Sequence, residues 1–523
     1  MIHRSPEPGV EIPDTDVTSY VLEHAAERGE RPALIDGTSG RELSYAGLEK
    51  AVRSLAAGLS ARGFGKGDVL AVYMPNVPEY AVAFHGVAAA GGMCTTVNPL
   101  YTAKELAHQL EDSGARTLLT IPSFLEAGLE AAAIAHVDDV VVLGEADGAT
   151  SFSDLLGDPD QAPTPDIDPG SDLAVLPYSS GTTGLPKGVM LSHRNLVANL
   201  CQSERGLGMQ DGEIVIGVLP FFHIYGMTVI MNLGLRCGAT IVTMPRFELE
   251  QFLDLLEQYR VTRAFVVPPI ALALAKHPAV DGRDLSALRT IMCGAAPLGA
   301  EVAQRVGNRI DCFMMQGYGL TETSPVTHTI PPDPQRNKPG SIGPPLAGTQ
   351  CRLVDPETGE DVAEGERGEL WIRGPQVMQG YLNNAEATAG TVDADGWLHS
   401  GDIATVDGDG YFQIVDRLKE LIKYKGYQVA PAELEALMLT HPDVGDVAVI
   451  GVADEEAGEL PKAFVVTADD ELDPDQLMSW VNEQVAPQKR IRLVELVDEI
   501  PKSPSGKILR RVLVERERAA SGA

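Results

Sequence analysis

The first 330 residues alternate short apolar runs with longer amphipathic stretches, and this alternation restricts the possible folds more than any other feature. Apolar runs at 68–75, 213–220 and 263–269 predict buried strands. Residues 44–63 carry apolar side chains at helical spacing and end on Gly63, a natural helix stop. Parallel strands need a crossover connection, usually a helix, so we expect an α/β fold of parallel sheets with covering helices.

The pattern changes after about Gly340. Residues 349–375 combine short strand patterns with a Gly/Asp-rich hairpin, which predicts a small β unit. From Lys419 onward a compact unit follows, with predicted helices starting at Pro431 and covering 474–485. Its predicted strands cover 447–452, 462–467 and 490–497. Because about a hundred residues can form a domain, we place a boundary at the charged run 416–420 and expect domains of 1–418 and 419–523.

Composition excludes several kinds of partner. The chain of 523 residues carries 41 basic and 74 acidic side chains, a net charge of −33, which disfavours nucleic acid and anionic membranes. Six cysteines without a CxxC pair predict reduced thiols and no zinc framework. No window reaches the roughly 18 apolar residues of a membrane span, and the N-terminal residues lack an apolar signal core. We therefore expect a cytoplasmic protein that does not bind membranes.

Residues 178–188, YSSGTTGLPKG, combine bare backbone, hydroxyl groups and one lysine, which is typical of a phosphate site. The nucleoside-triphosphatase loop GxxxxGK[ST] does not fit, because Pro186 stands where that pattern needs glycine. Strand patterns on both sides predict a hairpin tip, followed by a helix capped by Ser192. The alternative interpretation of this loop alone is a flexible Gly/Ser hairpin without a ligand.

Three further segments favour a nucleotide. In QGYGLTETSPV, Tyr318 lies between glycines and can stack on a base, while Glu322 can hold magnesium beside phosphate oxygens. Asp402 can accept hydrogen bonds from ribose hydroxyls, and Arg417 can donate to ribose or phosphate. Lys507 stands in a second glycine loop, PKSPSGKILRR. Each segment alone fits an ordinary turn or basic face, but together they predict an ATP site assembled from distant segments.

In this order and spacing the four segments resemble the acyl-adenylate-forming superfamily, which includes acyl- and aryl-CoA ligases, firefly luciferase and peptide-synthetase adenylation domains. The resemblance covers nearly the whole chain and is strongest to the 4-coumarate–CoA ligase group, through stretches at 98–115, 219–227, 267–278, 292–299, 418–435 and 499–511. It implies a large N-terminal domain with two α/β sheets and a small β-barrel-like unit, followed by a small, rotating C-terminal α+β domain. It also implies that ATP and an acid form an acyl-AMP, from which the coenzyme A thiol then displaces AMP.

The resemblance assigns roles residue by residue. Lys507 bridges the carboxylate and the α-phosphate, and His223 steers the carboxylate, although a lone histidine among apolar residues also fits a core position. Lys423 and Gln428 act after the rotation or contact AMP, and Lys419 lies near the hinge. The magnesium ligands are Glu322 and Thr182. The nucleotide-binding residues are Ser179, Ser180, Gly181, Thr182, Thr183, Gly184, Lys187, Gln316, Gly317, Tyr318, Gly319, Thr321, Asp402 and Arg417.

The resemblance also implies which residues line the acid pocket. They are Tyr225, Met227, Val229, Cys293, Gly294, Ala295, Pro325 and Val326. The stretch PFFHIYG carries no acidic side chain to pair with an ammonium, so an α-amino acid is disfavoured, and the pocket stretches carry no cation for a dicarboxylate. A hydroxycinnamate or similar aryl acid is expected, and a medium-chain fatty acid is the alternative, because one or two pocket substitutions exchange them.

Partner chemistry leaves further alternatives. The expected partners are a small carboxylic acid, ATP with Mg²⁺, and coenzyme A, but a carrier-protein thiol could replace coenzyme A. The basic stretches 487–492 and 510–511 fit either coenzyme A phosphates or a solvated charged surface. A non-catalytic nucleotide-binding regulator is a third hypothesis, which the retained Lys507 and Glu322 disfavour.

Overall fold

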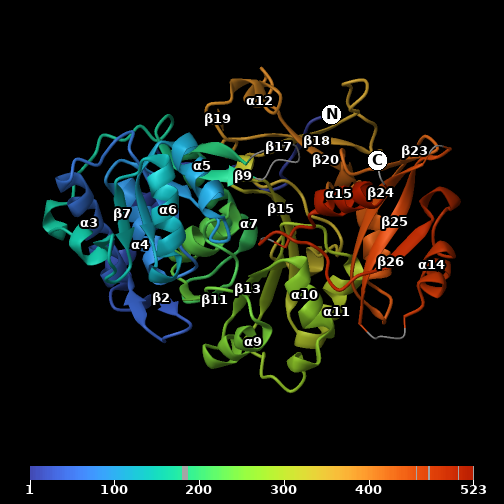
Figure 1. Ribbon diagram of the computed structural model, residues 1–523, viewed down its shortest axis with the longest axis horizontal. Helices are drawn as coiled ribbons and strands as arrows, with labels where there is room; N and C mark the ends of the chain where they lie inside the picture. The colour runs from blue at the N-terminus through green and yellow to red at the C-terminus, as the bar shows by residue number, and fades with distance from the viewer. Residues whose placement is uncertain (180–185, 455, 469–471, 505, 522–523) are drawn as a thin grey trace.

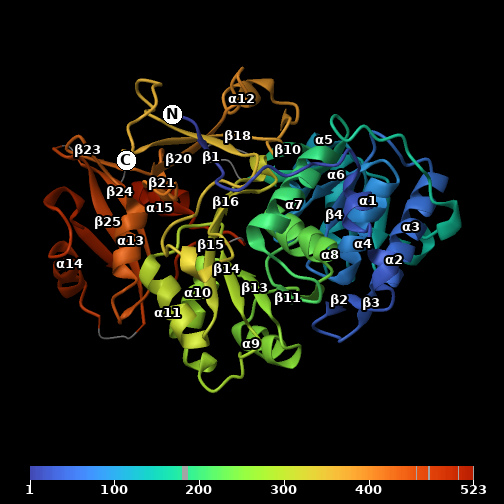
Figure 2. The same ribbon diagram turned by 180° about the vertical axis from the view of Figure 1, so that it is seen from behind.

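A computed structural model describes residues 1–179, 186–454, 456–468, 472–504 and 506–521 (Figure 1). The N-terminal sheet and the C-terminal unit lie on opposite sides of a central sheet, and an antiparallel unit lies across the top of both views (Figures 1 and 2). The predicted α/β class is confirmed. No helix among these residues is both long and apolar enough to span a bilayer.

The first sheet has eight strands in the order β19-β10-β9-β5-β4-β6-β7-β8. Its strands are β4 (Val69–Tyr73), β5 (Met93–Thr96), β6 (Ala115–Thr120), β7 (Asp139–Val142), β8 (Thr150–Ser151), β9 (Leu173–Ser179), β10 (Lys187–Ser192) and β19 (Gly380–Tyr381). From β9 to β8 neighbouring strands are parallel, whereas β10 pairs antiparallel with β9 and β19. The predicted hairpin around residues 178–188 is thus the β9–β10 pair.

The second sheet also has eight strands, in the order β16-β15-β14-β13-β11-β12-β2-β3. Its strands are β2 (Pro32–Asp36), β3 (Glu42–Ser44), β11 (Ile214–Gly217), β12 (Thr240–Thr243), β13 (Arg263–Val266), β14 (Thr290–Cys293), β15 (Phe313–Gly319) and β16 (Val326–Thr329). The central strands are parallel and only the outer pairs β15–β16 and β2–β3 are antiparallel. Both sheets contribute to one large hydrophobic core.

Helices cover these sheets, and the sequence explains where several begin and end. They are α1 (Val17–Val21), α2 (Ala25–Arg28), α3 (Tyr45–Ala61), α4 (Pro78–Ala89), α5 (Ala103–Ser113), α6 (Leu125–Ala135), α7 (His193–Leu207), α8 (Leu233–Cys237), α9 (Leu249–Gln258), α10 (Pro268–Lys276), α11 (Ala300–Ile310) and α12 (Ala385–Ala389). The predicted cap of α7 is confirmed: the Ser192 hydroxyl accepts the Asn195 N–H at 3.2 Å.

The antiparallel unit holds the strands β1 (His3–Arg4), β17 (Gln350–Val354), β18 (Gly368–Arg373), β20 (Leu398–Val406) and β21 (Phe412–Arg417), paired in that order. It has a core of its own around Phe412. Because β20 and β21 are directly paired, polar residues near the end of β21 lie opposite those near the start of β20.

Residues after 419 build a separate sheet. Its strands are β22 (Ile422–Tyr424), β23 (Tyr427–Val429), β24 (Val444–Asp454), β25 (Gly458–Thr467) and β26 (Leu493–Leu496), and its helices are α13 (Pro431–Met438), α14 (Pro474–Asn482) and α15 (Arg510–Ser521). Ile422, Leu434, Met438 and Val481 belong to a core that this unit does not share with the large sheets. A domain division between 418 and 419 remains our proposal.

Candidate active site

A cavity of about 2590 Å³ lies where the strands β9 and β10, the end of β15, the strands β20 and β21, and residues 502–504 and 506–507 approach one another. Predicted residues from all four motifs line it: Ser179, Lys187, His223, Tyr225, Gly294, Ala295, Gln316, Gly317, Tyr318, Gly319, Thr321, Glu322, Pro325, Val326, Asp402, Arg417, Lys419 and Lys507. The fold thus brings together segments that lie more than 300 positions apart in the sequence. Ser180, Gly181, Thr182, Thr183 and Gly184 lie outside the described residues.

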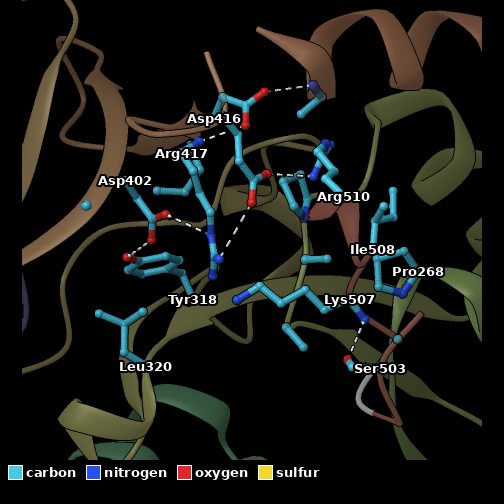
Figure 3. A pocket seen from close by; sticks show the side chains of 18 of the residues that line it. Pro268, Tyr318, Leu320, Asp402, Asp416, Arg417, Ser503, Lys507, Ile508 and Arg510 are labelled. Carbon is cyan, nitrogen blue, oxygen red and sulfur yellow. Dashed lines mark hydrogen bonds and ion pairs between the residues drawn. The ribbon is translucent and has the colours of Figure 1, made fainter. Parts of the chain in front are cut away.

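The carboxylate of Asp402 organises one wall of this cavity (Figure 3). It accepts the phenol of Tyr318 at 2.5 Å and lies 3.6 Å from Nε of Arg417, its opposed residue in β21. Burial raises the pKa of Asp402 above its ordinary value, while Arg417 and the Tyr318 phenol oppose that rise. A buried carboxylate beside a guanidinium can accept one pair of vicinal hydroxyls while the guanidinium donates to a phosphate.

Glu322 marks a second polar wall. It is on the 3₁₀ turn η6 (Thr321–Thr323), and its Oε1 accepts the hydroxyls of Ser179 at 2.9 Å and Tyr381 at 2.8 Å. The Lys187 ammonium lies 5.0 Å from the centre of the Tyr381 ring, within cation–π range. Among the described residues, no side-chain hydrogen bond engages Oε2 of Glu322, which leaves this oxygen available to a ligand in the cavity.

The donor set at Glu322 fits magnesium better than a fully protein-bound metal. Mg²⁺ is usually held by one or two carboxylates together with phosphate oxygens and water. Within the described part of the chain, no cluster of three or more His, Cys, Asp or Glu side chains has metal-binding geometry. One carboxylate oxygen beside the hairpin that is predicted to bind phosphate matches that pattern.

Lys507 enters the cavity from the C-terminal unit. Its side chain points toward Arg417 and Tyr318 (Figure 3). The backbone behind it is closed by two hydrogen bonds with Ser503, from Ser503 N–H to Lys507 O at 2.8 Å and from Lys507 N–H to the Ser503 hydroxyl at 3.1 Å. Gly506 has φ +77°, and a Cβ there would lie 2.9 Å from Val267, so only glycine lets this turn pack so closely.

Lys423 and Gln428 lie outside the cavity. They are directly opposed residues in the hairpin β22–β23, both side chains are exposed, and neither lines the cavity. The turn between them has positive φ at Lys425 and Gly426, the conformation that suits a two-residue hairpin. The structure therefore presents Lys507 to the cavity and leaves the Lys423 hairpin outside it.

The segment that is predicted to bind the base runs to the end of β15. A Cβ on Gly319 would lie 2.1 Å from the backbone oxygen of Pro325, so this position requires glycine. A Cβ on Gly317 would lie 2.2 Å from the terminal methyl of Met292, a flexible side chain that can move aside. Between them Tyr318 is half-buried and packs against the core of the antiparallel unit. Gln316, two residues before Tyr318 in the strand, is buried. The stacking of a purine on Tyr318 remains a proposal.

The predicted acid pocket needs a correction. Met227 and Val229 are fully buried and Cys293 is 2 % exposed, and none of the three lines the cavity. Residues Tyr225–Asn232 form the π-helix η4, all of whose residues are buried, and Met227 and Val229 pack in the main core. Tyr225 faces the cavity, and its hydroxyl donates to Met292 O at 3.3 Å. Burial raises the pKa of Cys293, so this thiol stays protonated and fits packing rather than chemistry.

Other predicted pocket residues meet at the cavity. The ring of Tyr225 lies 3.2 Å from where a Cβ on Gly294 would stand, so the missing side chain leaves room beside the phenol. Ala295 follows with φ +71°, and Pro325 and Val326 close the pocket from the start of β16. The resulting wall is apolar apart from one phenol that is already hydrogen-bonded, which suits a flat hydrocarbon group.

His223 lies at the border between this apolar wall and the polar site. Its Nδ1 accepts the Tyr225 N–H at 3.3 Å, which places the ring proton on Nε2. Burial lowers the pKa of His223 to about 4, so the imidazole is neutral at pH 7. A neutral ring with an Nε2–H donor can orient a carboxylate without forming an ion pair with it.

Sequence reasoning missed several residues that organise the site. Tyr381, the second donor to Glu322, comes from the short strand β19, and nothing in its local sequence marks it. The sequence marks Arg510 only as part of a basic tail, yet it donates to both oxygens of Glu435 at 2.7 Å and to Glu420 at 2.7 Å. The sequence offered one signal for Arg510, its position three residues after Lys507.

Two family models match the chain, "AMP-binding enzyme" over residues 21–382 and "AMP-binding enzyme C-terminal domain" over residues 433–507. The chain is 44% identical to 4-coumarate–CoA ligase 3 of Oryza sativa subsp. japonica, across 100% of this chain and 96% of that protein. It is 42% identical to 4-coumarate–CoA ligase 1 of Petroselinum crispum, across 100% and 97%.

Solved structures show the same architecture. The anthranilate CoA ligase AuaEII in complex with anthranoyl-AMP superposes with a TM-score of 0.89 at 26% identity, covering 98% of each chain. ATP-bound MatB from Rhodopseudomonas palustris superposes with a TM-score of 0.86 at 30% identity, covering 97% of this chain and 100% of that one. The resemblance found in the motifs and the expected fold are both confirmed.

Proposed function

The chain belongs to the AMP-binding enzyme family and is an AMP-forming ligase that joins an aryl acid to coenzyme A; we propose that this acid is a hydroxycinnamate such as 4-coumarate. The proposal rests on one arrangement above all. Lys507, the Asp402–Arg417 pair and Glu322 come from three distant segments and line one cavity next to an apolar pocket. ATP and coenzyme A are its co-substrates.

In the first step, a carboxylate oxygen of the acid attacks the α-phosphorus of ATP, and the bond to the bridging oxygen breaks. Acyl-AMP and pyrophosphate result. Asp402 and Arg417 hold the ribose, and Lys507 lies between them and the acid, where its ammonium stabilises negative charge on the α-phosphate and the carboxylate. Lys187 and Ser179 bind the outer phosphates. When bound at Glu322, Mg²⁺ supplies charge neutralisation of the phosphate oxygens.

In the second step, the thiol of coenzyme A attacks the acyl carbonyl, the bond to the AMP oxygen breaks, and the thioester and AMP leave. The present arrangement places Lys507 in the cavity and the Lys423–Gln428 hairpin outside it. We infer that the small domain, residues 419–523, turns about the segment near Lys419 between the steps. Such a rotation exchanges one face of the domain for another over the same acyl-AMP.

The apolar pocket supports an aromatic acid. Gly294 leaves room beside the Tyr225 ring, and no charged side chain from 219–229 or 292–298 enters the cavity. Magnesium, the rotating domain and a cytoplasmic location remain parts of the proposal. A medium-chain fatty acid and a carrier-protein thiol stay as alternative outcomes of the test below, since no contact in the site favours them.

A substrate panel tests the proposal. Purified protein with ATP, Mg²⁺ and coenzyme A is given hydroxycinnamates, benzoates and medium-chain fatty acids, and AMP, pyrophosphate and thioester are measured. We expect 4-coumarate to give the highest kcat/KM, with all three products in equal amounts. A higher kcat/KM for fatty acids, or pyrophosphate exchange that coenzyme A never converts into thioester formation, would overturn the assigned acid or the assigned acceptor respectively.

A further inference from the structure

The C-terminal end of α13 is bound by a lysine from the large domain. Lys276 is the last residue of α10, and its Nζ lies within hydrogen-bond distance of three backbone carbonyls, those of Leu439 at 2.9 Å, Val444 at 3.0 Å and His441 at 3.4 Å. The last carbonyls of a helix have no intrahelical donor, and the helix dipole places partial negative charge there. Of the three carbonyls, that of Leu439 is the C-cap of α13, whereas those of His441 and Val444 belong to the following turn and to the first residue of β24. An ammonium with three N–H donors can serve all three acceptors, and its charge suits the helix end.

The N-terminal end of the same helix is bound by a carboxylate. Oδ2 of Asp416 accepts the N–H of Ala432 at 2.8 Å, and its Oδ1 accepts the N–H of Arg417 at 2.7 Å. Pro431 opens the helix without an N–H, so Ala432 carries one of the donors that lack an intrahelical partner. Asp416 is 4 % exposed and precedes the proposed boundary, so it belongs to the large domain.

We propose that Lys276 is a positioning residue for the first half-reaction: with Asp416 it clamps α13 by both ends and holds the small domain where Lys507 reaches the nucleotide. This inference rests on the proposed function. The two clamping charges match the helix dipole, negative at the start of α13 and positive at its end. Both contacts cross the proposed domain boundary, so neither survives a rotation of residues 419–523.

Helix α10, which carries Lys276, also contacts the turn that presents Lys507 to the cavity. The start of α10 packs against Gly506, where an added Cβ would lie 2.9 Å from the Val267 side chain and 3.3 Å from that of Pro269. One end of α10 therefore contacts the turn that presents Lys507, and the other end binds α13. Turning the Lys423 hairpin toward the cavity must break both contacts together. Lys276 thus stabilises the arrangement for acyl-AMP formation and not the arrangement for thioester formation.

The test separates the two half-reactions in the full-length protein. Lys276→Met keeps the approximate length of the side chain but removes the ammonium. We expect acid-dependent exchange of labelled pyrophosphate into ATP to fall about tenfold, while thioester formation from supplied coumaroyl-AMP and coenzyme A stays unchanged or becomes faster. Lys276→Arg, which can still donate to carbonyls, should recover most of the exchange. Lys50→Met, an exposed substitution on α3, is the matched control and should change neither rate.

Each outcome decides the proposal. Equal losses in both half-reactions, or no loss in either, would overturn it, and the supplied-adenylate reaction reports whether the variant is folded. Hydrogen exchange gives a second measurement: in Lys276→Met the amides of α13 and of 506–509 should exchange faster than in the wild type, and unchanged protection there would contradict the clamp. If wild-type protein shows no pyrophosphate exchange with any acid, the proposed function fails instead, and the two failures are distinguishable.

Discussion

Arg417 and Asp402 face each other directly across β20 and β21, with Nε of the arginine 3.6 Å from Oδ1 of the aspartate. Asp402→Asn keeps the shape but removes the negative charge. We predict that KM for ATP rises about 10- to 100-fold, because hydrogen bonds to charged groups contribute about 1.5–3 kcal/mol. ATP titrations of pyrophosphate release measure this change. Tyr318→Phe, which removes only the phenol hydroxyl, should raise the KM less, and an unchanged KM in folded Asp402→Asn would contradict a ribose-binding role.

Two lysines of the small domain should act in different half-reactions, Lys507 in acyl-AMP formation and Lys423 in thioester formation. Lys507 enters the cavity and Lys423 lies outside it. We predict that Lys507→Ala lowers pyrophosphate exchange by roughly a hundredfold or more, because it removes the cation nearest the developing charge, but leaves thioester formation from supplied acyl-AMP close to that of the wild type. Lys423→Ala should show the reverse preference. Both variants are measured in both half-reactions, and equal losses throughout would contradict the alternating use of the two lysines.

A disulfide between the domains should arrest the enzyme after its first step. A Cβ built on Gly299 lies 3.5 Å from the Cβ of Ala436 on α13, within the range that disulfides need. We predict that oxidised Gly299→Cys/Ala436→Cys keeps pyrophosphate exchange and loses thioester formation, and that a reductant restores it. The two single-cysteine variants are the controls. Full thioester formation by the quantitatively oxidised protein would show that the small domain need not move.

Buried histidines should make the fold sensitive to mild acid. His85 and His328 are fully buried, and burial lowers the pKa of His85 to about 4 and the pKa of His328 to about 3. Between the ordinary pKa of 6.5 and these values the unfolded chain binds protons that the folded protein does not, so the free energy of unfolding falls as pH falls. Each histidine contributes a slope of up to about 1.4 kcal/mol per pH unit.

Urea unfolding at a series of pH values between about 7.5 and 5 measures that slope. His85→Gln lowers stability at every pH because it disturbs a buried contact with Thr18. It should also make the free energy of unfolding depend less steeply on pH, because the unfolded chain then takes up about one proton fewer. Thr18→Val, which removes the same contact but keeps the imidazole, is the control and should lower stability without making the slope shallower. A slope in His85→Gln equal to that of the wild type would mean that His85 is already protonated or is not buried in the native state.

The local pattern of apolar residues, glycines and prolines was enough to predict most of the helices and strands. The apolar periodicity of 44–63 became α3, the run at 68–75 became β4, and Pro431 opens α13 as its fixed φ suggests. The glycine-rich segment lies between two antiparallel strands, as the flanking apolar runs indicated. These features depend on backbone propensity and on burial of one face, which the residues themselves encode.

Contacts that depend on distant packing could not be predicted this way. Met227 and Val229 were assigned to the acid pocket by motif, but every residue of the π-helix η4 is buried, and these two pack in the core and do not line the cavity. Lys276 ends an ordinary helix, and only the docking of the segment that follows α13 gives its ammonium three acceptors. Tyr381 similarly reaches Glu322 because β19 adds to the edge of β10.

The central claim is that an acid oxygen attacks the α-phosphate of ATP in this cavity. 4-Coumarate labelled with ¹⁸O in its carboxylate tests it most directly, with the AMP and pyrophosphate analysed by mass spectrometry after thioester formation. The mechanism predicts one ¹⁸O atom in each AMP and none in pyrophosphate. Unlabelled AMP, or label in pyrophosphate or orthophosphate, would contradict formation of an acyl-AMP.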